Sequence, residues 1–173
     1  MKFTRTVTSV GCVLLLLAVL MVVMLQNSTF ARDDGSNARD RTAIEEKLLY
    51  AYAYAYDSKD CASWAKLFTA DAVLNLGGGM KATGREALLQ GCLKRQESVV
   101  GDIKTRHYMT NIVFDQLTAQ QAKTRTYVVI TWQKPGDMTP NVQLALVYRD
   151  VIVKQADGRW LFKERVAVDP PNQ

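Results

Sequence analysis

The sequence holds few of the residues from which metal sites and nucleophile sites are built. It has one histidine, His107, and three cysteines, and no two of the cysteines are spaced as zinc ligands are. The stretch GGGMKATGRE has Arg85 and Glu86 where a phosphate-binding loop has lysine and then serine or threonine, and no G-x-S-x-G elbow occurs. We therefore expect no metal site, no nucleotide-binding loop and no esterase of that type.

Clustered positive charge is also missing. The net charge is +5 at pH 7, but the basic residues are scattered among acidic ones rather than gathered in a stripe. We therefore expect no nucleic-acid partner. A chain of 173 residues, 48% of them hydrophobic and without internal repeats, predicts one domain with a real core.

The first thirty residues differ from the rest of the chain. Two basic residues precede an apolar run from Val10 to Leu25, and Thr29 and Ala31 follow at a spacing that a signal peptidase accepts. The run is shorter than the roughly 18 to 20 residues of a comfortable membrane-spanning helix. Residues 1–31 are therefore predicted to be a cleaved signal peptide rather than an uncleaved signal anchor. We expect a secreted or periplasmic protein, in contact with a membrane only if the leader is uncleaved.

The polar stretch after the leader predicts a linker over residues 32–40, a folded domain over 41–168 and a tail over 169–173. Thr42 and Glu45 have the spacing of a capping box that begins a helix.

The repeat YAYAYAYD, residues 50–57, alternates as a strand does, but the apolar residues before it recur in steps of three and four, which predicts a helix. On a helix, Tyr52 and Tyr56 extend the core face. Tyr50, Tyr54 and Asp57 lie on another side, so the aspartate stands beside tyrosines.

The remaining pattern predicts helices followed by strands. A short helix over 61–68, a brief strand leading to the glycines and a helix over 84–95 come first. Beyond residue 104 four segments rich in β-branched and aromatic residues follow, with a tight hairpin at Asp157-Gly158. This order is typical of an α+β fold. Cys61 and Cys92 either form a bridge between two helices or remain two buried thiols.

One pair of residues is a candidate for chemistry. Asp57 ends the tyrosine-rich helix, and His107 begins a strand. A carboxylate that holds one imidazole nitrogen fixes the tautomer and raises the basicity of the other nitrogen, which makes a workable general base. The ordinary alternative is an aspartate in a helix-ending turn and a histidine in a satisfied core or surface position.

Four stretches together resemble the nuclear transport factor 2-like superfamily, and within it the SnoaL-like branch that includes scytalone dehydratase. They are YAYAYDSKDCASWAKLFTADAVL, GREAL, TRHYMTNI and ADGRWLFKERV. The resemblance implies a cone in which three helices are wrapped by a curved antiparallel sheet around an apolar cavity. It also implies that Asp57 and His107 meet in that cavity with Tyr56 beside them.

Some positions depart from the dehydratase pattern. Leu76 stands where the dehydratase has a tyrosine, Trp132 where it has a second histidine, and Arg149 where it has an asparagine near the pocket. Dehydration in a melanin pathway is therefore not expected. Arg125 and Arg149 line the cavity or lie outside on a solvated sheet face; we favour the outside for Arg149.

The resulting hypothesis is a cofactor-free lyase or isomerase acting on a small hydrophobic cyclic or polyketide-like carbonyl compound. His107, oriented by Asp57, removes a proton, and Tyr56 or Asn75 donates a hydrogen bond to the developing enolate. Aromatic walls from Tyr52, Phe114 and Trp132 hold the ring.

Two other hypotheses stay open at this stage. One is an exported binding module that holds a hydrophobic ligand in the same cavity without converting it. The other is an interaction protein that pairs through an open sheet face made of alternating apolar residues, namely Val142, Leu144, Leu146 and Tyr148. Whichever hypothesis holds, we expect a homodimer or homotrimer.

Overall fold

The computed structural model describes residues 35–77 and 80–168. The predicted signal peptide over 1–31 and the predicted tail over 169–173 lie outside the described residues. Residues 1–39 and 40–173 form separate units, and the second contains the predicted site. Within the described ranges, no helix combines the length and the apolar character needed to cross a membrane.

The N-terminal helical region begins earlier than predicted. Residues 35–44 are already helical, so residues 35–40 of the predicted linker are helix. A wide helical turn, η1 (Glu45–Leu49), follows, and its first residue is preceded by helical Ile44 with no side-chain capping bond. The prediction that a capping box at Thr42 begins the helix was therefore wrong, because the chain reaches Thr42 in helical conformation.

The tyrosine repeat forms α2 (Tyr50–Asp57), as the flanking periodicity predicted. Tyr52 and Tyr56 are buried, with 1% and 6% exposure, whereas Tyr54 is 78% exposed. The alternation thus places two tyrosines in the core and two on the outside.

The described residues form three further helical segments: α3 (Cys61–Ala65), α4 (Arg85–Arg95) and the wide turn η2 (Gln96–Val100). Cys61 and Cys92 form a disulfide between α3 and α4, so the bridged alternative holds. Both cysteines are buried, and the bridge ties the two helices together at the core.

Over the part of the chain that the structure describes, the sheet has six strands, β1 (Phe68–Asn75), β2 (Lys81–Thr83), β3 (Lys104–Leu117), β4 (Gln121–Gln133), β5 (Asn141–Lys154) and β6 (Trp160–Val168). Their order is β2-β1-β6-β5-β4-β3. All neighbours are antiparallel except β1 and β6, which are parallel. The strand β2 was not predicted. The hairpin at Asp157-Gly158 was, and it is confirmed by Gly158 at a φ of 84°.

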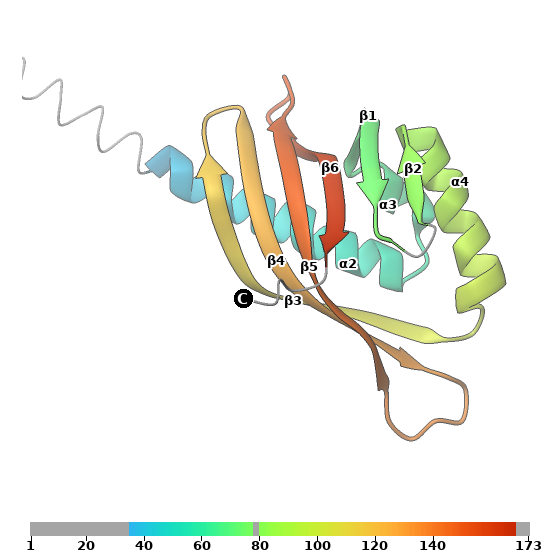
Figure 1. The fold of residues 1–173 in the computed structure, drawn as a ribbon. Helices are drawn as coiled ribbons and strands as arrows, with labels where there is room; N and C mark the ends of the chain where they lie inside the picture. The colour runs from blue at the N-terminus through green and yellow to red at the C-terminus, as the bar shows by residue number, and fades with distance from the viewer. Residues whose placement is uncertain (1–34, 78–79, 169–173) are drawn as a thin grey trace, which may run out of the picture. The chain divides into compact units, whose positions relative to one another are not determined.

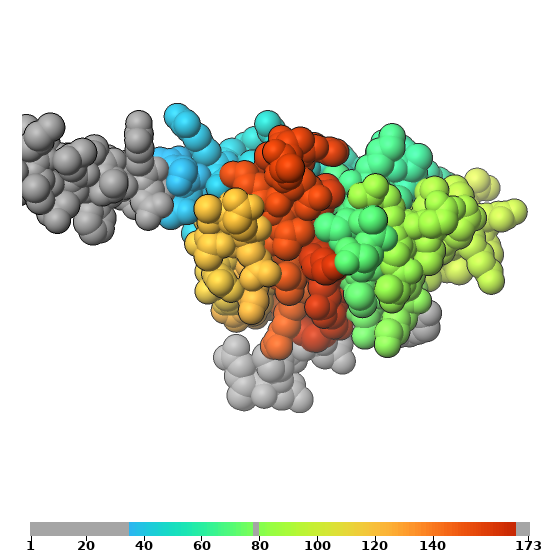
Figure 2. Space-filling view, turned by 90° about the horizontal axis from the view of Figure 1, so that it is seen from above, coloured from blue at the N-terminus to red at the C-terminus, as the bar shows by residue number. Residues whose placement is uncertain are grey.

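The sheet curves around the helices, with α2 lying across its inner face (Figure 1). Viewed from above, the yellow-orange, red and green parts of the chain stand side by side, with cyan helical residues behind them (Figure 2). The α+β cone is therefore confirmed, and the core lies between the helices and the concave face of the sheet.

The predicted apolar face on β5 is split in two. Leu146 and Tyr148 are buried in the core, whereas Val142 and Leu144 are 64% and 49% exposed. The first half of β5 belongs to the β4–β5 hairpin, which extends past the helices in Figure 1 and so lacks their cover. The prediction that all four residues form one open pairing surface was therefore wrong.

Candidate functional site

A sharp turn after α2 positions the end of the YDSKD stretch. The backbone N–H and the hydroxyl of Ser58 both donate to the carbonyl of Tyr54, at 3.0 and 2.7 Å. Lys59 then takes a left-handed conformation, with a φ of 63°, which costs on the order of 1 kcal/mol for a residue other than glycine. The side chain of Asp60 accepts from the N–H of Ser63 at 2.9 Å and begins α3. The turn leaves Asp57 at the helix end, facing β3.

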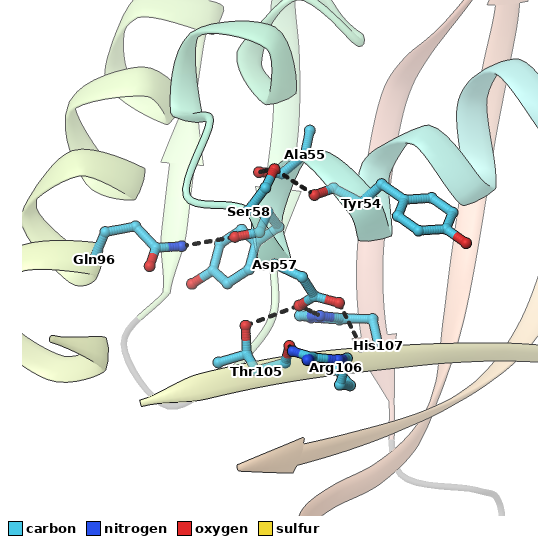
Figure 3. Close-up of polar contacts among 9 residues, drawn as sticks. Tyr54, Ala55, Asp57, Ser58, Gln96, Thr105, Arg106 and His107 are labelled. Carbon is cyan, nitrogen blue, oxygen red and sulfur yellow. Dashed lines mark hydrogen bonds and ion pairs between the residues drawn. The ribbon is translucent and has the colours of Figure 1, made fainter. Parts of the chain in front are cut away.

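The carboxylate of Asp57 accepts three hydrogen bonds from β3 (Figure 3). Its Oδ1 lies 2.7 Å from His107 Nδ1 and accepts from the Thr105 hydroxyl at 2.8 Å. Its Oδ2 accepts from the backbone N–H of His107 at 2.8 Å. The predicted meeting of Asp57 and His107 is thus observed, and the strand holds the carboxylate in one orientation.

These contacts decide the charge of Asp57. Burial alone would raise the pKa of this carboxyl, but the hydrogen bonds from His107 and Thr105 and the attraction of the imidazole lower the pKa below its ordinary value. Asp57 is therefore ionised at neutral pH. In the neutral imidazole, the Nδ1 of His107 is then the donor to Asp57 and Nε2 carries the lone pair.

Two core tyrosines pack edge-on against the imidazole. The ring centroids of Tyr56 and Tyr52 lie 5.2 and 6.1 Å from that of His107. Burial is the main cause that raises the pKa of Tyr56 to about 12, so its hydroxyl keeps its proton at neutral pH. The backbone carbonyl of Tyr56 accepts from Gln96 Nε2 at 3.0 Å, which ties this end of α2 to η2.

A small cavity of about 60 Å³ lies beside His107. Its walls include Tyr52, Tyr56, Leu76, Ile130 and Trp132. The volume equals that of about two liquid-phase waters. The predicted wall residues Tyr52 and Trp132 therefore share one cavity with Tyr56 and His107.

Asn75 and Phe114, which were predicted at the substrate, do not line this cavity. Side chains alternate in direction along the strand, so Leu76 points into the cavity and its neighbour Asn75 does not. The Asn75 side chain instead accepts a hydrogen bond from the N–H of Gly77 at 3.3 Å. The ring of Phe114 lies 4.3 Å from the guanidinium carbon of Arg41. The pairing of β3 with β4 shifts register between Thr110 and Val113, before Phe114 is reached.

The outer side of the Asp57–His107 pair borders an open groove of about 690 Å³ between α2 and the edge strand β3. Its lining includes Tyr50, Tyr54 and Met109. Tyr50 and Tyr54, which the helix places beside Asp57, are exposed in this groove.

Sequence reasoning missed Thr105, although a signal for it existed. It stands two residues before His107 and so shares its face of the strand. Its side chain is buried and bonded to Asp57.

Sequence reasoning also missed a buried ion pair behind Tyr52. The guanidinium of Arg165 donates to both carboxylate oxygens of Asp150, at 2.7 and 2.8 Å, and both side chains are fully buried. The guanidinium carbon lies 4.1 Å from the ring centroid of Tyr52 and 4.3 Å from that of Tyr148. Burial alone would lower the pKa of Arg165, but Asp150 raises it, so this cation persists in the core.

The two arginines that were weighed as cavity residues lie elsewhere. Arg149 is exposed, as favoured, and Arg125 forms a two-pronged pair with exposed Asp115 at 2.8 to 3.0 Å. Among the described residues, no three side chains of the metal-ligating types gather into a site.

Comparison with known proteins gave matches to a family and to solved structures. The family model of the SnoaL-like domain matches residues 36–166. The comparison with curated protein sequences gave no match. One similar solved structure is a protein from Novosphingobium aromaticivorans that is named as a scytalone dehydratase. It superposes with a TM-score of 0.67 at 24% sequence identity, and the match covers 81% of this chain and 98% of that chain.

Two further solved structures show the same fold. ActVI-ORFA from Streptomyces coelicolor has a TM-score of 0.60 at 20% identity, over 68% of this chain and 87% of that chain. A protein from Catenulispora acidiphila, in complex with S-DNPA, has a TM-score of 0.59 at 23% identity, over 82% of this chain and 92% of that chain.

Proposed function

The chain belongs to the SnoaL-like domain family of the nuclear transport factor 2-like superfamily, and we propose that it is a cofactor-free lyase or isomerase for a small cyclic carbonyl compound. The observation that carries this proposal is the bond between His107 Nδ1 and the ionised Asp57, because it leaves Nε2 as the basic nitrogen of a residue that lines the cavity.

The proposed step is removal of a proton from the carbon next to the carbonyl. The proton moves to His107 Nε2, and the electron pair of the broken C–H bond forms an enolate. Asp57 stabilises the imidazolium that results, through the 2.7 Å contact. The imidazolium then returns the proton to another carbon, which isomerises the substrate, or to a leaving hydroxyl, which departs as water.

Tyr56 is the proposed donor to the enolate oxygen. It lines the cavity, its ring contacts His107 and its hydroxyl keeps its proton at neutral pH. A donor held in place in a dry site stabilises developing charge without reorganisation. Asn75, the other predicted donor, is engaged with Gly77 outside the cavity and is not assigned this role.

The neighbouring structures support a small-molecule ligand for this fold. The Catenulispora acidiphila protein was solved with a small molecule, and the Novosphingobium aromaticivorans protein is named for a dehydratase. Because Trp132 and Leu76 line the cavity here, we propose a hydrophobic ring as the part of the substrate next to His107.

The test follows exchange of the α-protons of 2-tetralone in deuterium oxide by NMR, with wild-type protein and His107→Gln. General-base catalysis predicts a drop of about 10² to 10⁴-fold in the catalysed rate. Tyr108→Phe, which alters an exposed tyrosine on the same strand, should leave the rate unchanged. Equal rates for wild type and His107→Gln would contradict the proposal.

A second candidate is a noncatalytic binding module, favoured by the apolar Leu76 and Trp132 in the cavity wall. It predicts that 2-tetralone binds without exchange. Export remains a prediction for either function, and the Cys61–Cys92 disulfide supports it, because disulfides persist in secreted and periplasmic proteins. A homodimer or homotrimer also remains a prediction.

A further inference from the structure

A second pocket of about 310 Å³ lies between α4 and the strands β1 and β2. It falls within the size range of small-molecule sites, whereas the cavity beside His107 is far below that range. The two spaces share three lining residues, Tyr56, Met80 and Arg95. The second pocket is therefore adjacent to the first, and a ligand that fills both reaches the imidazole.

The charges of this pocket have one sign. Lys81, Lys94 and Arg95 line it, and none of the other described residues that line it is acidic. No ion pair joins these three cations to an acid among residues 35–77 and 80–168. Stabilisation of a helix end does not explain Lys94 and Arg95, because the helical path continues from α4 through η2.

The walls of the pocket are apolar. Trp64, Leu74 and Leu88 line it, and all three are buried. The indole N–H of Trp64 has no hydrogen-bond partner within the described residues, although buried donors are normally paired. An apolar body with an anionic group matches such a lining.

Arg95 is the cation that both spaces share. Its side chain is half-buried, unlike the exposed Lys81 and Lys94. It also interacts with the Tyr56 hydroxyl. A carboxylate at Arg95 would thus lie next to the tyrosine that packs on His107.

We propose that the α4–β1–β2 pocket binds a carboxylate carried by an aromatic or cyclic small molecule, and that Arg95 determines this specificity. The inference rests on the proposed function for the identity of that molecule as the substrate. It assigns the substrate as an apolar ring compound with an anionic group, anchored at Arg95 and turned toward His107.

The experiment compares binding of 2-naphthoate with that of the uncharged 2-naphthamide, by calorimetry at low ionic strength. Wild type should bind the carboxylate at least about tenfold more tightly, and Arg95→Gln should abolish this preference while leaving the affinity for the amide. Arg95→Lys should retain part of it. Arg149→Gln, which removes an exposed cation outside this pocket, should retain all of it.

Several outcomes would overturn the proposal: no binding of either probe by wild type, equal binding of both, or an unchanged preference in Arg95→Gln. If circular dichroism shows that Arg95→Gln does not fold, the wild-type protein provides a second test. Its preference for the carboxylate over the amide should fall as sodium chloride rises from 50 to 500 mM, because salt screens the charge of Arg95. A preference that stays constant would overturn the proposal. Measurement in His107→Gln separates the two ideas. If His107→Gln still prefers the carboxylate but no longer exchanges the protons of 2-tetralone, the result agrees with both the carboxylate pocket and the proposed function. If wild type prefers the carboxylate but does not catalyse the exchange, the result contradicts only the proposed function.

Discussion

The backbone N–H and the ring Nδ1 of His107 both bond to the carboxylate of Asp57, at 2.8 Å to Oδ2 and 2.7 Å to Oδ1. His107 on β3 thus contacts both carboxylate oxygens of Asp57 at the end of α2. Rotation of the carboxylate would break both contacts. The imidazole is therefore held in one orientation by the fold before any ligand binds, which is the pre-organisation that a positioned base requires.

The first prediction concerns the pH dependence of stability. The pKa of Asp57 is lowered in the folded protein, so its contribution is present above the ordinary carboxyl pKa of about 3.9 and is lost as pH falls through the folded value. Asp57→Asn should lower the free energy of unfolding by about 1 to 3 kcal/mol at pH 7, because bonds to a charged group are lost. The measurement is denaturant unfolding of both proteins at pH 7, 5 and 3.

The difference between wild type and Asp57→Asn should shrink at pH 3. Asp115→Asn, which alters an exposed carboxylate, serves as the control and should change stability little at any of these pH values. A difference in unfolding free energy that stays constant down to pH 3 would show that the charge of Asp57 does not stabilise the fold.

The second prediction concerns Thr105, the remaining donor to Asp57. Thr105→Val keeps the shape of this buried side chain and removes its hydroxyl. The expected loss is about 1 kcal/mol of unfolding free energy together with a smaller loss of 2-tetralone exchange than in His107→Gln. Thr110→Val, at an exposed position of the same strand, should change neither quantity. If Thr105→Val leaves the exchange rate unchanged, Thr105 does not help to position the catalytic pair.

The third prediction concerns the buried pair of Arg165 and Asp150. Arg165→Met leaves a buried carboxylate without its partner and should cost about 3 to 5 kcal/mol of unfolding free energy. The double variant Arg165→Met/Asp150→Leu should be more stable than Arg165→Met alone, because it removes the unpaired charge. Thermal and denaturant unfolding of the three proteins decide this, and additive losses in the double variant would contradict it.

The fourth prediction concerns the bridge between α3 and α4. The disulfide closes a separation of 31 residues, for which chain-entropy reasoning gives a stabilisation of about 3 to 4 kcal/mol. Cys61→Ser/Cys92→Ser should show this loss in denaturant unfolding. A reductant should destabilise wild type and leave the double variant unaffected. Equal stability of the two proteins would show that the bridge does not support the fold.

Much of the fold could be predicted from local patterns. The spacing of apolar residues identified α2 and α4, and the two-residue period identified the four long strands, because both patterns report which face is buried. The strand β2, three residues long, has too few positions to show a period. The parallel pairing of β1 with β6 joins segments far apart in sequence, which local patterns do not encode.

The candidate site was predicted in part. Asp57 and His107 lie together with Tyr56 beside them, as the resemblance implied, and Tyr52 and Trp132 line the same cavity, as the functional hypothesis expected. Asn75 was misplaced because one step along a strand reverses a side chain. Phe114 was misplaced because it lies seven residues beyond His107 along β3, where it packs against the core beside Arg41 rather than at the cavity. Arg165 was missed because a basic residue in a strand is ordinarily exposed, and its partner Asp150 lies on another strand.

The tautomer of the single histidine decides whether the Asp57 contact leaves Nε2 free to act as a base. Long-range ¹H–¹⁵N correlation spectra at pH 8 identify which nitrogen of His107 carries the proton in neutral imidazole, without interference from other histidines. The Asp57 contact predicts the Nδ1–H form in wild type, with Nε2 unprotonated, and loss of that preference in Asp57→Asn. A dominant Nε2–H form in wild type, unchanged in Asp57→Asn, would contradict the account, because the base would then have no lone pair beside the cavity.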